Sequence, residues 1–157
     1  MLSRTQPRPA DAPDLSLAEI QHPLIDAYLE ALPEGRKPRI LASRTVFVAN
    51  DNEEALRFAE IGLGRHRAWL AKSGRATGDG SLDAMIAAMD AHLGTADDVI
   101  ASLQTDSTLA RVTDVAVQVH SIDPPHPFIL RSIELVAEVV APALGWGRHA
   151  TGVRRFA

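Results

Sequence analysis

Only two segments of this 157-residue chain have the character of β-strands, and a long helix-forming stretch separates them. Residues 39–48 are rich in β-branched side chains, and residues 112–119 alternate between apolar and polar side chains. Strands that are joined through helices normally lie parallel. A parallel sheet needs more than two strands and helices on both faces. We therefore expect an α/β, helix-rich fold with about two parallel strands that forms part of a larger layer.

Amphipathic patterns predict helices before, between and after the two strands. The first helix begins at Ser16, which forms a capping-box pattern with Glu19. Asn50 and Asp51 offer a cap for the next helix, and the acidic residues that follow suit the positive end of its dipole. The order is thus helix, strand, long helical excursion, strand, helix. The remaining helices are predicted from Ser81, from about Thr95, and over about residues 129–140.

The two ends of the chain lack the periodicity of the rest. Residues 1–15 contain three prolines and no apolar repeat, which predicts a disordered tail. Residues 146–157 are basic and rich in glycine, which predicts a flexible C-terminal tail. The length of the chain suits a single domain. We therefore expect one folded domain over residues 16–145.

Composition argues against several classes of function. The formal net charge is −4, from 16 Lys and Arg against 20 Asp and Glu, whereas DNA affinity depends on basic residues. No stretch approaches the ~20 apolar residues of a membrane span, and the first residues lack the apolar core of a secretory signal. The absence of cysteine excludes disulfides, thiolate catalysis and cysteine-ligated zinc. We therefore expect a cytoplasmic protein with no nucleic-acid or membrane partner.

Three stretches of the chain match motifs that occur together in one protein family. Residues 43–55 (SRTVFVANDNEEA) resemble a strand followed by a V-A-x-[TD]-x-E-E-A helix start. Residues 93–99 (LGTADDV) resemble a G-T-P-E-x-V turn, with Ala96 in place of the proline. Residues 131–144 (RSIELVAEVVAPAL) resemble the helix R-S-x-E-L-x-A-x-x-V-x-P-x-L. In this order and spacing the chain resembles the C-terminal portion of the bacterial luciferase-like superfamily of flavin-dependent monooxygenases, over about residues 17–145.

The resemblance implies a TIM-type (β/α)8 barrel, of which this chain is the C-terminal portion with the last two strands. Members of the family bind reduced FMN, or a deazaflavin in some branches, and many use O₂ to oxidise small organic substrates. The segments that build most of the flavin pocket in relatives have no counterpart in this chain. The resemblance therefore implies a segment of an FMN-dependent monooxygenase that needs a complementing N-terminal half for activity.

Polar side chains near the end of the second predicted strand are candidate ligand contacts. In a (β/α)8 barrel the active site lies at the C-terminal ends of the strands, whose residues alternate between lumen and helices. Val115, Val117 and Val119 form the more apolar set, so Gln118 and, at the rim, His120 are expected to face the lumen. His120 is then placed to hydrogen-bond a flavin edge or to transfer a proton. The alternative is a rim histidine that faces water or bonds the next loop.

In the first predicted strand, the resemblance puts ligand-facing polar residues at Ser43 and Thr45. A structural role for these two side chains is an equally open alternative. With both in the lumen, Arg44 lies beneath the helices, where its charge requires a carboxylate partner or access to water. No two histidines have the i, i+4 spacing of a metal-binding helix, so no metal site is expected.

The sequence also allows a function without catalysis, because the chain contains no complete set of catalytic residues. The chain is then a non-catalytic remnant or an interaction module of the same fold. In both cases two parallel strands expose unpaired edges and an apolar face, and such surfaces recruit partners. We therefore expect self-association, or binding to a complementing half-barrel chain, in place of a compact monomer.

Overall fold

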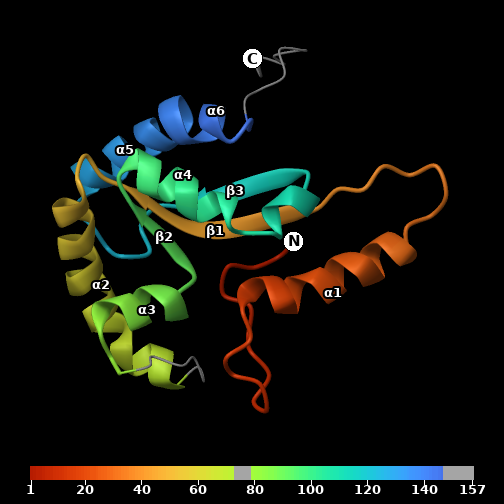
Figure 1. The fold of residues 1–157 in the computed structure, drawn as a ribbon, viewed down its shortest axis with the longest axis horizontal. Coiled ribbons are helices and arrows are strands. Elements are labelled where there is room, and N and C mark those ends of the chain that lie inside the picture. Colours follow the sequence, from red (N-terminus) through yellow and green to blue (C-terminus); the bar gives the residue numbers. More distant parts are fainter. Residues whose placement is uncertain (73–78, 147–157) are drawn as a thin grey trace.

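The computed structural model describes residues 1–72 and 79–146 and shows a mixed α/β fold around one three-stranded parallel sheet (Figure 1). Strand β1 (Leu41–Val48) lies in the centre, with β2 (Ala91–Gly94) on one side and β3 (Asp114–Gln118) on the other. Both pairings of β1 are parallel. The α/β class with a parallel sheet, as predicted from the sequence, is confirmed.

Helices precede the sheet and follow each of its strands. The capping box predicted at Ser16 and Glu19 is present, and Thr95 forms a second one with Asp98. In the described ranges, no helix combines the length and the apolar composition needed to cross a bilayer. The helices are α1 (Leu17–Glu30), α2 (Asn52–Lys72), α3 (Leu82–Ala88), α4 (Ala96–Gln104), a 3₁₀ turn (Leu109–Arg111), and α5 (His126–Leu135), which continues through a π-helical turn (Val136–Val140) into α6 (Ala141–Ala143).

The third strand, β2, was missed by the sequence analysis, which predicts about two strands. Its four residues, Ala-His-Leu-Gly, contain no β-branched side chain and stand directly before the strong cap at Thr95. They form a strand because their backbone pairs with β1, from Thr45↔Ala91 to Val48↔Gly94. Pairing of this kind is a tertiary effect that overrides local preference.

The order of the strands in the sheet differs from their order in the chain. The chain adds β2 on one edge of β1 and then crosses β1 to add β3 on the other edge. Successive strands of a closed (β/α)8 barrel lie side by side in chain order. The described sheet is open, with β2 and β3 at its edges. The barrel itself therefore stays a prediction from the sequence motifs.

Helices pack on both faces of the sheet, and β1 contributes to a core on each side (Figure 1). On one face, Val46 and Val48 pack against α4 and the π-helical turn. On the opposite face, Phe47 packs edge-on against Phe58 of α2, with ring centroids 6.1 Å apart. Alternate residues of β1 thus enter two separate cores, as the two-residue period of a strand requires.

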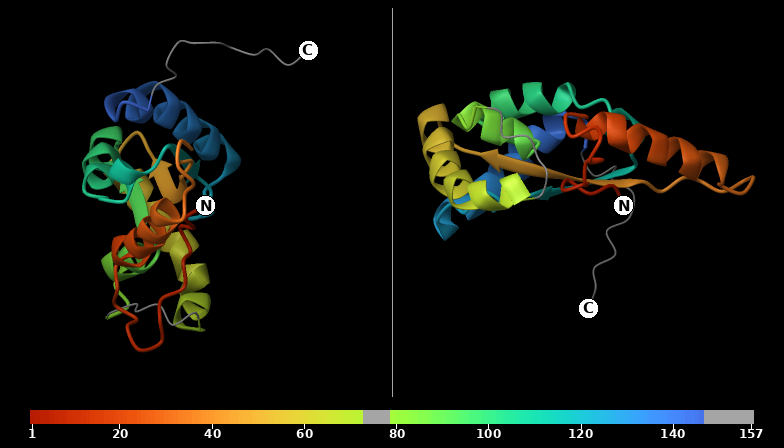
Figure 2. Two further views of the ribbon diagram at one scale, coloured as in Figure 1. Left: turned by 90° about the vertical axis from the view of Figure 1, so that its right-hand side faces the viewer. Right: turned by 90° about the horizontal axis from the view of Figure 1, so that it is seen from below.

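Helix α1 and the loop that leads from it to β1 extend away from the rest of the molecule as an arm (Figures 1 and 2). Ile25 anchors the arm, because its side chain is 1% exposed and packs with Leu2 and Ile40. Leu17 is buried as well, whereas several large apolar side chains of the helix stay in contact with water. The large apolar side chains of α1 that stay exposed are Leu24, Tyr28 and Leu29.

Residues 1–15 make defined contacts, although their composition predicts a disordered tail. The backbone N–H of Leu2 donates to the carbonyl of Leu41 (2.7 Å), and the N–H of Ser43 donates to the carbonyl of Leu2 (2.9 Å). Leu2 thereby bridges Ala42 in parallel on the stretch of β1 that the short β2 leaves unpaired. The open backbone groups of β1 supply the partner for this segment, and composition alone does not reveal such a partner.

Farther along the same segment, Arg8 Nη2 lies 2.8 Å from both carboxylate oxygens of Asp90, directly before β2. The N-terminal segment is thus tied to β1 and to the start of β2. At the other end, the predicted tail over residues 146–157 lies outside the described residues from 147 onward. Trp146, the last described residue, packs against the core that contains Val140.

We predict opposite effects of alanine at two glycines of α2. A Cβ added at Gly62 would lie 1.8 Å from the carbonyl oxygen of Ile122, in the turn between β3 and α5. Gly62→Ala is therefore expected to lower the free energy of unfolding by about 1–3 kcal/mol, as overpacking does. Gly64 has nothing within 4 Å of an added Cβ, so Gly64→Ala should stabilise the helix by up to about 1 kcal/mol. Urea unfolding measures both, and equal effects of the two substitutions would contradict this packing.

Candidate functional site

The alternation of β1 places Ser43 and Thr45 on one face of the sheet and Arg44 on the other. β3 pairs with this stretch in register, with Thr45 opposite Gln118 and Ser43 opposite Ala116. Paired residues of neighbouring strands project to the same side. Ser43, Thr45 and Gln118 therefore share one face, as the sequence analysis expected, while their contact with a ligand stays a prediction.

His120 stands two residues beyond Gln118, at the carboxyl end of β3. Gln118 Nε2 donates a hydrogen bond to Nε2 of His120 (2.9 Å), which assigns the proton of a neutral imidazole to Nδ1. The imidazole is exposed, and Gln118 is half-buried. The amide thus orients the ring and leaves Nδ1–H as its remaining donor.

A cleft of about 630 Å³ opens beside this end of β3. Its volume falls in the range of about 300–1,000 Å³ that is common for small-molecule sites. The N-terminal segment, the end of α3, and the end of β3 with the turn that follows it contribute to this cleft. The lining residues are Arg4, Thr5, Met89, Gln118, His120, Ser121 and Asp123.

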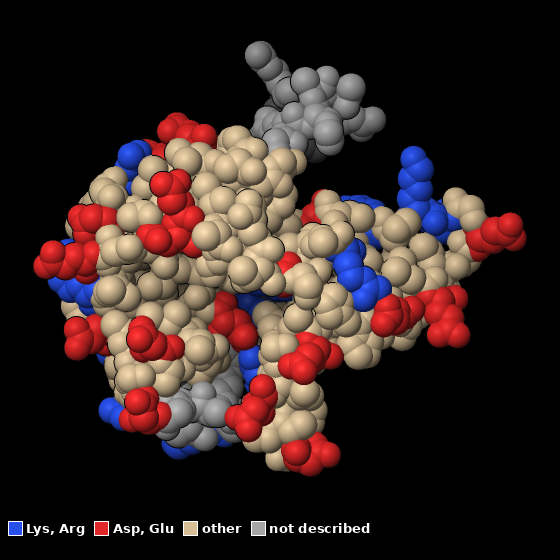
Figure 3. All heavy atoms as spheres, in the orientation of Figure 1, with Lys and Arg blue, Asp and Glu red and all other residues tan. Residues whose placement is uncertain are grey.

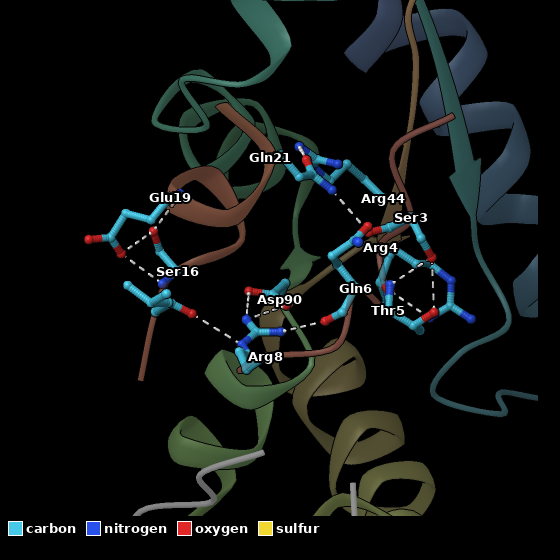
Figure 4. Close-up of polar contacts among 12 residues, drawn as sticks. Ser3, Arg4, Thr5, Gln6, Arg8, Ser16, Glu19, Gln21, Arg44 and Asp90 are labelled. Carbon is cyan, nitrogen blue, oxygen red and sulfur yellow. Dashed lines mark hydrogen bonds and ion pairs between the residues drawn. The ribbon is translucent and has the colours of Figure 1, made fainter. Parts of the chain in front are cut away.

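The other two predicted site residues, Ser43 and Thr45, lie beneath Arg4. The backbone N–H of Arg4 donates to Ser43 Oγ (3.0 Å), and its Nη1 donates to Thr45 Oγ1 (3.1 Å). Figure 4 shows Ser3, Arg4 and Thr5 side by side in this network, with Arg8 directed toward Asp90. The two hydroxyls of β1 therefore position Arg4 at the cleft, whereas Gln118 and His120 line it directly.

Of the charged side chains that line the cleft, Asp123 has an ion-pair partner and Arg4 has none among the described residues. Asp123 forms an ion pair with Arg65, and both side chains are mostly exposed. Burial lowers the pKa of the Arg4 guanidinium from its usual value. Ser121 Oγ is buried and has no hydrogen-bond partner among the described residues. The cleft thus has a partly desolvated cation on its wall, and the unsatisfied hydroxyl of Ser121 is buried behind its surface.

The opposite face of the sheet holds a second polar cluster, centred on Arg44. None of the Arg44 side chain is exposed, and it forms an ion pair with Asp106. Its Nη2 donates to Gln21 Oε1 (3.0 Å), and its Nη1 donates to the carbonyl of Ser43 (2.8 Å). The carboxylate partner that burial of Arg44 requires is thus present, which confirms that expectation.

His92 of β2 belongs to the same cluster. Its Nδ1 lies 2.7 Å from Ser102 Oγ of α4. Burial lowers the pKa of His92, the nearby charge of Arg44 acts in the same direction, and Asp106 opposes it. A small cleft of about 180 Å³ adjoins the histidine, and Figure 3 shows the hollow between α1 and the rest of the molecule.

Sequence reasoning missed the residues that complete the first cleft. Arg4 and Thr5 belong to a proline-rich stretch without periodicity, and the bridge of Leu2 to β1, with the bonds of Arg4 to Ser43 and Thr45, brings them to the site. Ser121 and Asp123 follow β3 in a turn whose Asp123 adopts a left-handed conformation (φ 53°). A polar turn directly after a parallel strand is a usable signal for site residues. The proline-rich stretch carries no comparable signal.

Over residues 1–72 and 79–146, no three His, Asp or Glu side chains gather in a way that could hold a metal ion. On the face shown in Figure 3, acidic side chains are scattered widely among basic ones, and the visible described surface has no continuous basic patch. Neither a family model nor a curated protein sequence matches this chain.

We predict that His92 makes folding stability depend on pH. Because its pKa is lowered in the folded state, the unfolded chain binds the proton more readily. The contribution of His92 to the free energy of unfolding is therefore largest above about pH 6.5, the pKa of histidine in an unfolded chain. It decreases as the pH falls through that value. His92→Asn, which can keep the bond to Ser102, should flatten this dependence between about pH 7.5 and 5.5. Urea unfolding at several pH values measures how the free energy of unfolding depends on pH. His126→Asn, at an exposed histidine, is the control. If the pH dependence of His92→Asn equals that of wild type, His92 is not its source.

Proposed function

We propose that this chain binds a flavin, FMN in the first instance, on the polar face of β1 and β3 as part of a luciferase-like flavin-dependent monooxygenase. The three sequence motifs support the family, and the cleft at the end of β3 supports the site. The observation that carries the proposal is that Gln118 and His120 line this cleft beside Arg4, which Ser43 and Thr45 hold in place.

The topology of the sheet gives independent support for a ligand at this position. In open parallel α/β sheets, ligands bind outside the carboxyl ends of the strands, at the point where the direction of strand addition reverses. With the order β2-β1-β3, that point lies between β1 and β3. His120 stands at the carboxyl end of β3, next to this point. Because one fold serves many functions, the side chains at this point, and not the topology alone, support the ligand site.

Each side chain has a definite role in this proposal. Gln118 orients the imidazole of His120, whose Nδ1–H is then available to donate to a flavin oxygen or nitrogen. Ser43 and Thr45 position Arg4. The bound flavin would supply the oxidation chemistry with O₂, and the protein supplies binding, orientation and exclusion of water. Small organic molecules are the corresponding substrates in the proposal.

A TIM-type barrel is part of the same proposal. The chain then contributes its strands to a (β/α)8 barrel whose other strands come from a complementing half-barrel chain. In the described sheet β1 and β3 are neighbours, with Thr45 opposite Gln118, and the proposed site uses this pairing.

The flavin proposal predicts FMN binding that depends on His120. Titration of FMN into the chain should quench flavin fluorescence, with micromolar affinity. His120→Ala removes one hydrogen bond worth about 1 kcal/mol and should weaken binding about fivefold. His126→Ala removes an exposed imidazole outside the cleft and should leave binding unchanged. Absence of FMN binding, or equal affinities of the two variants, would contradict the proposal.

A second candidate function is a non-catalytic interaction module, and the free edge of β3 favours it. β3 is an edge strand with no Lys or Pro, and Val115 and Val117 line a groove of about 440 Å³ beside Trp146. Unprotected edges of this kind pair with other strands. The partner in this proposal is a second copy of the chain or the complementing half-barrel chain.

The interaction module predicts a species larger than the 16.9 kDa monomer. Light scattering coupled to size exclusion at micromolar concentration measures the mass. Ala116→Lys places a charge on an exposed position of the edge strand and should shift the chain toward monomer. Leu24→Lys on the exposed face of α1 is the control and should leave the mass unchanged. A monomer at all concentrations would overturn this candidate.

A further inference from the structure

Arg4 differs from the other arginines that are half-buried or buried in the described part of the chain. Each of the others pairs with a carboxylate. The side chain of Arg4 bonds to a neutral hydroxyl, Thr45 Oγ1, and to no carboxylate of the described residues. The pairs formed by the others are Arg8–Asp90, Arg44–Asp106 and Arg111–Asp26.

The position of Arg4 is set by its backbone and not by a counter-charge. Its N–H donates to Ser43 Oγ (3.0 Å), and two residues earlier Leu2 bridges β1. This backbone attachment holds the guanidinium in a partly desolvated place, where a positive charge without a counter-charge is unfavourable. An anion that enters the cleft would supply the missing charge.

The surroundings of Arg4 also suit an anion. The Nδ1–H of His120 is a second donor on the cleft wall. The acidic residue of the lining, Asp123, is engaged by Arg65 at the exposed rim. The cleft therefore presents one imidazole donor and one positive charge without a carboxylate partner among the described residues.

We propose that Arg4 is the anchor of an oxyanion subsite in this cleft and that the oxyanion is a phosphate monoester. A guanidinium binds phosphate through two parallel N–H···O bonds, which a hydroxyl partner such as Thr45 does not replace. The assignment of this phosphate to FMN rests on the function proposed above. The subsite itself rests on the geometry of Arg4 and holds for free phosphate as well.

The test compares two flavins with the same ring system, FMN with its phosphate and riboflavin without it. Wild type, Arg4→Gln, Arg4→Lys and the control Arg36→Gln are titrated by flavin fluorescence. Arg36 is an exposed arginine on the loop between α1 and β1, so its variant makes the same change of net charge outside the cleft. In parallel, the melting temperature of each variant is measured with and without inorganic phosphate.

Wild type and Arg36→Gln should bind FMN about tenfold or more tightly than riboflavin, and Arg4→Gln should lose this preference. Arg4→Lys keeps the charge and should retain part of the preference for FMN. This variant therefore separates the role of the charge from an effect on folding. Phosphate should raise the melting temperature of wild type more than that of Arg4→Gln.

Equal affinities of wild type for the two flavins, or a preference that survives Arg4→Gln, would overturn the subsite while leaving flavin binding in place. If neither flavin binds but phosphate still stabilises wild type more than Arg4→Gln, the subsite stands and the flavin function fails. If wild type and Arg4→Gln behave alike both in the flavin titrations and in the melting experiments with phosphate, the subsite is overturned.

Discussion

Arg44 stands in the middle of β1 with none of its side chain exposed, and Asp106 and Gln21 supply the groups that make its burial possible. Removing one partner of such a buried ion pair typically costs about 3–5 kcal/mol, so the register of β1 is strongly fixed. A slip of one residue would turn Arg44 to the other face. The same register directs Ser43 and Thr45 away from Arg44 and toward the cleft. The site on one face therefore depends on the ion pair on the other.

The N-terminal segment occupies part of the edge of β1 that the short β2 does not reach. Leu2 pairs with the unpaired stretch of β1, and this pairing delivers Arg4 to the hydroxyls of Ser43 and Thr45. Arg8 then ties the segment to Asp90. Backbone pairing, a polar face and an ion pair thus bring residues 1–8 to a site whose other half comes from the turn after β3.

Local periodicity predicted the α/β class and the two longer strands, whereas the family resemblance put Ser43 and Thr45 on the ligand-facing side with Gln118. The sequence also predicted that a buried Arg44 needs a carboxylate partner or access to water, and Asp106 provides the carboxylate. It missed β2 and the contacts of residues 1–15, because both depend on pairing with β1 and not on local preference. It missed Arg4 for the same reason: nothing in a proline-rich stretch indicates which strand edge will receive it.

The central claim is that the polar face of β1 and β3, with Arg4 above it, is the ligand-binding surface. Backbone amide shifts in the NMR spectrum of the ¹⁵N-labelled chain during addition of FMN test it most directly. We expect the largest shifts at residues 2–5 and 118–121, with the amides of the α1 arm unchanged. Shifts confined to the arm or to the groove beside Trp146, or no shifts at all, would contradict it.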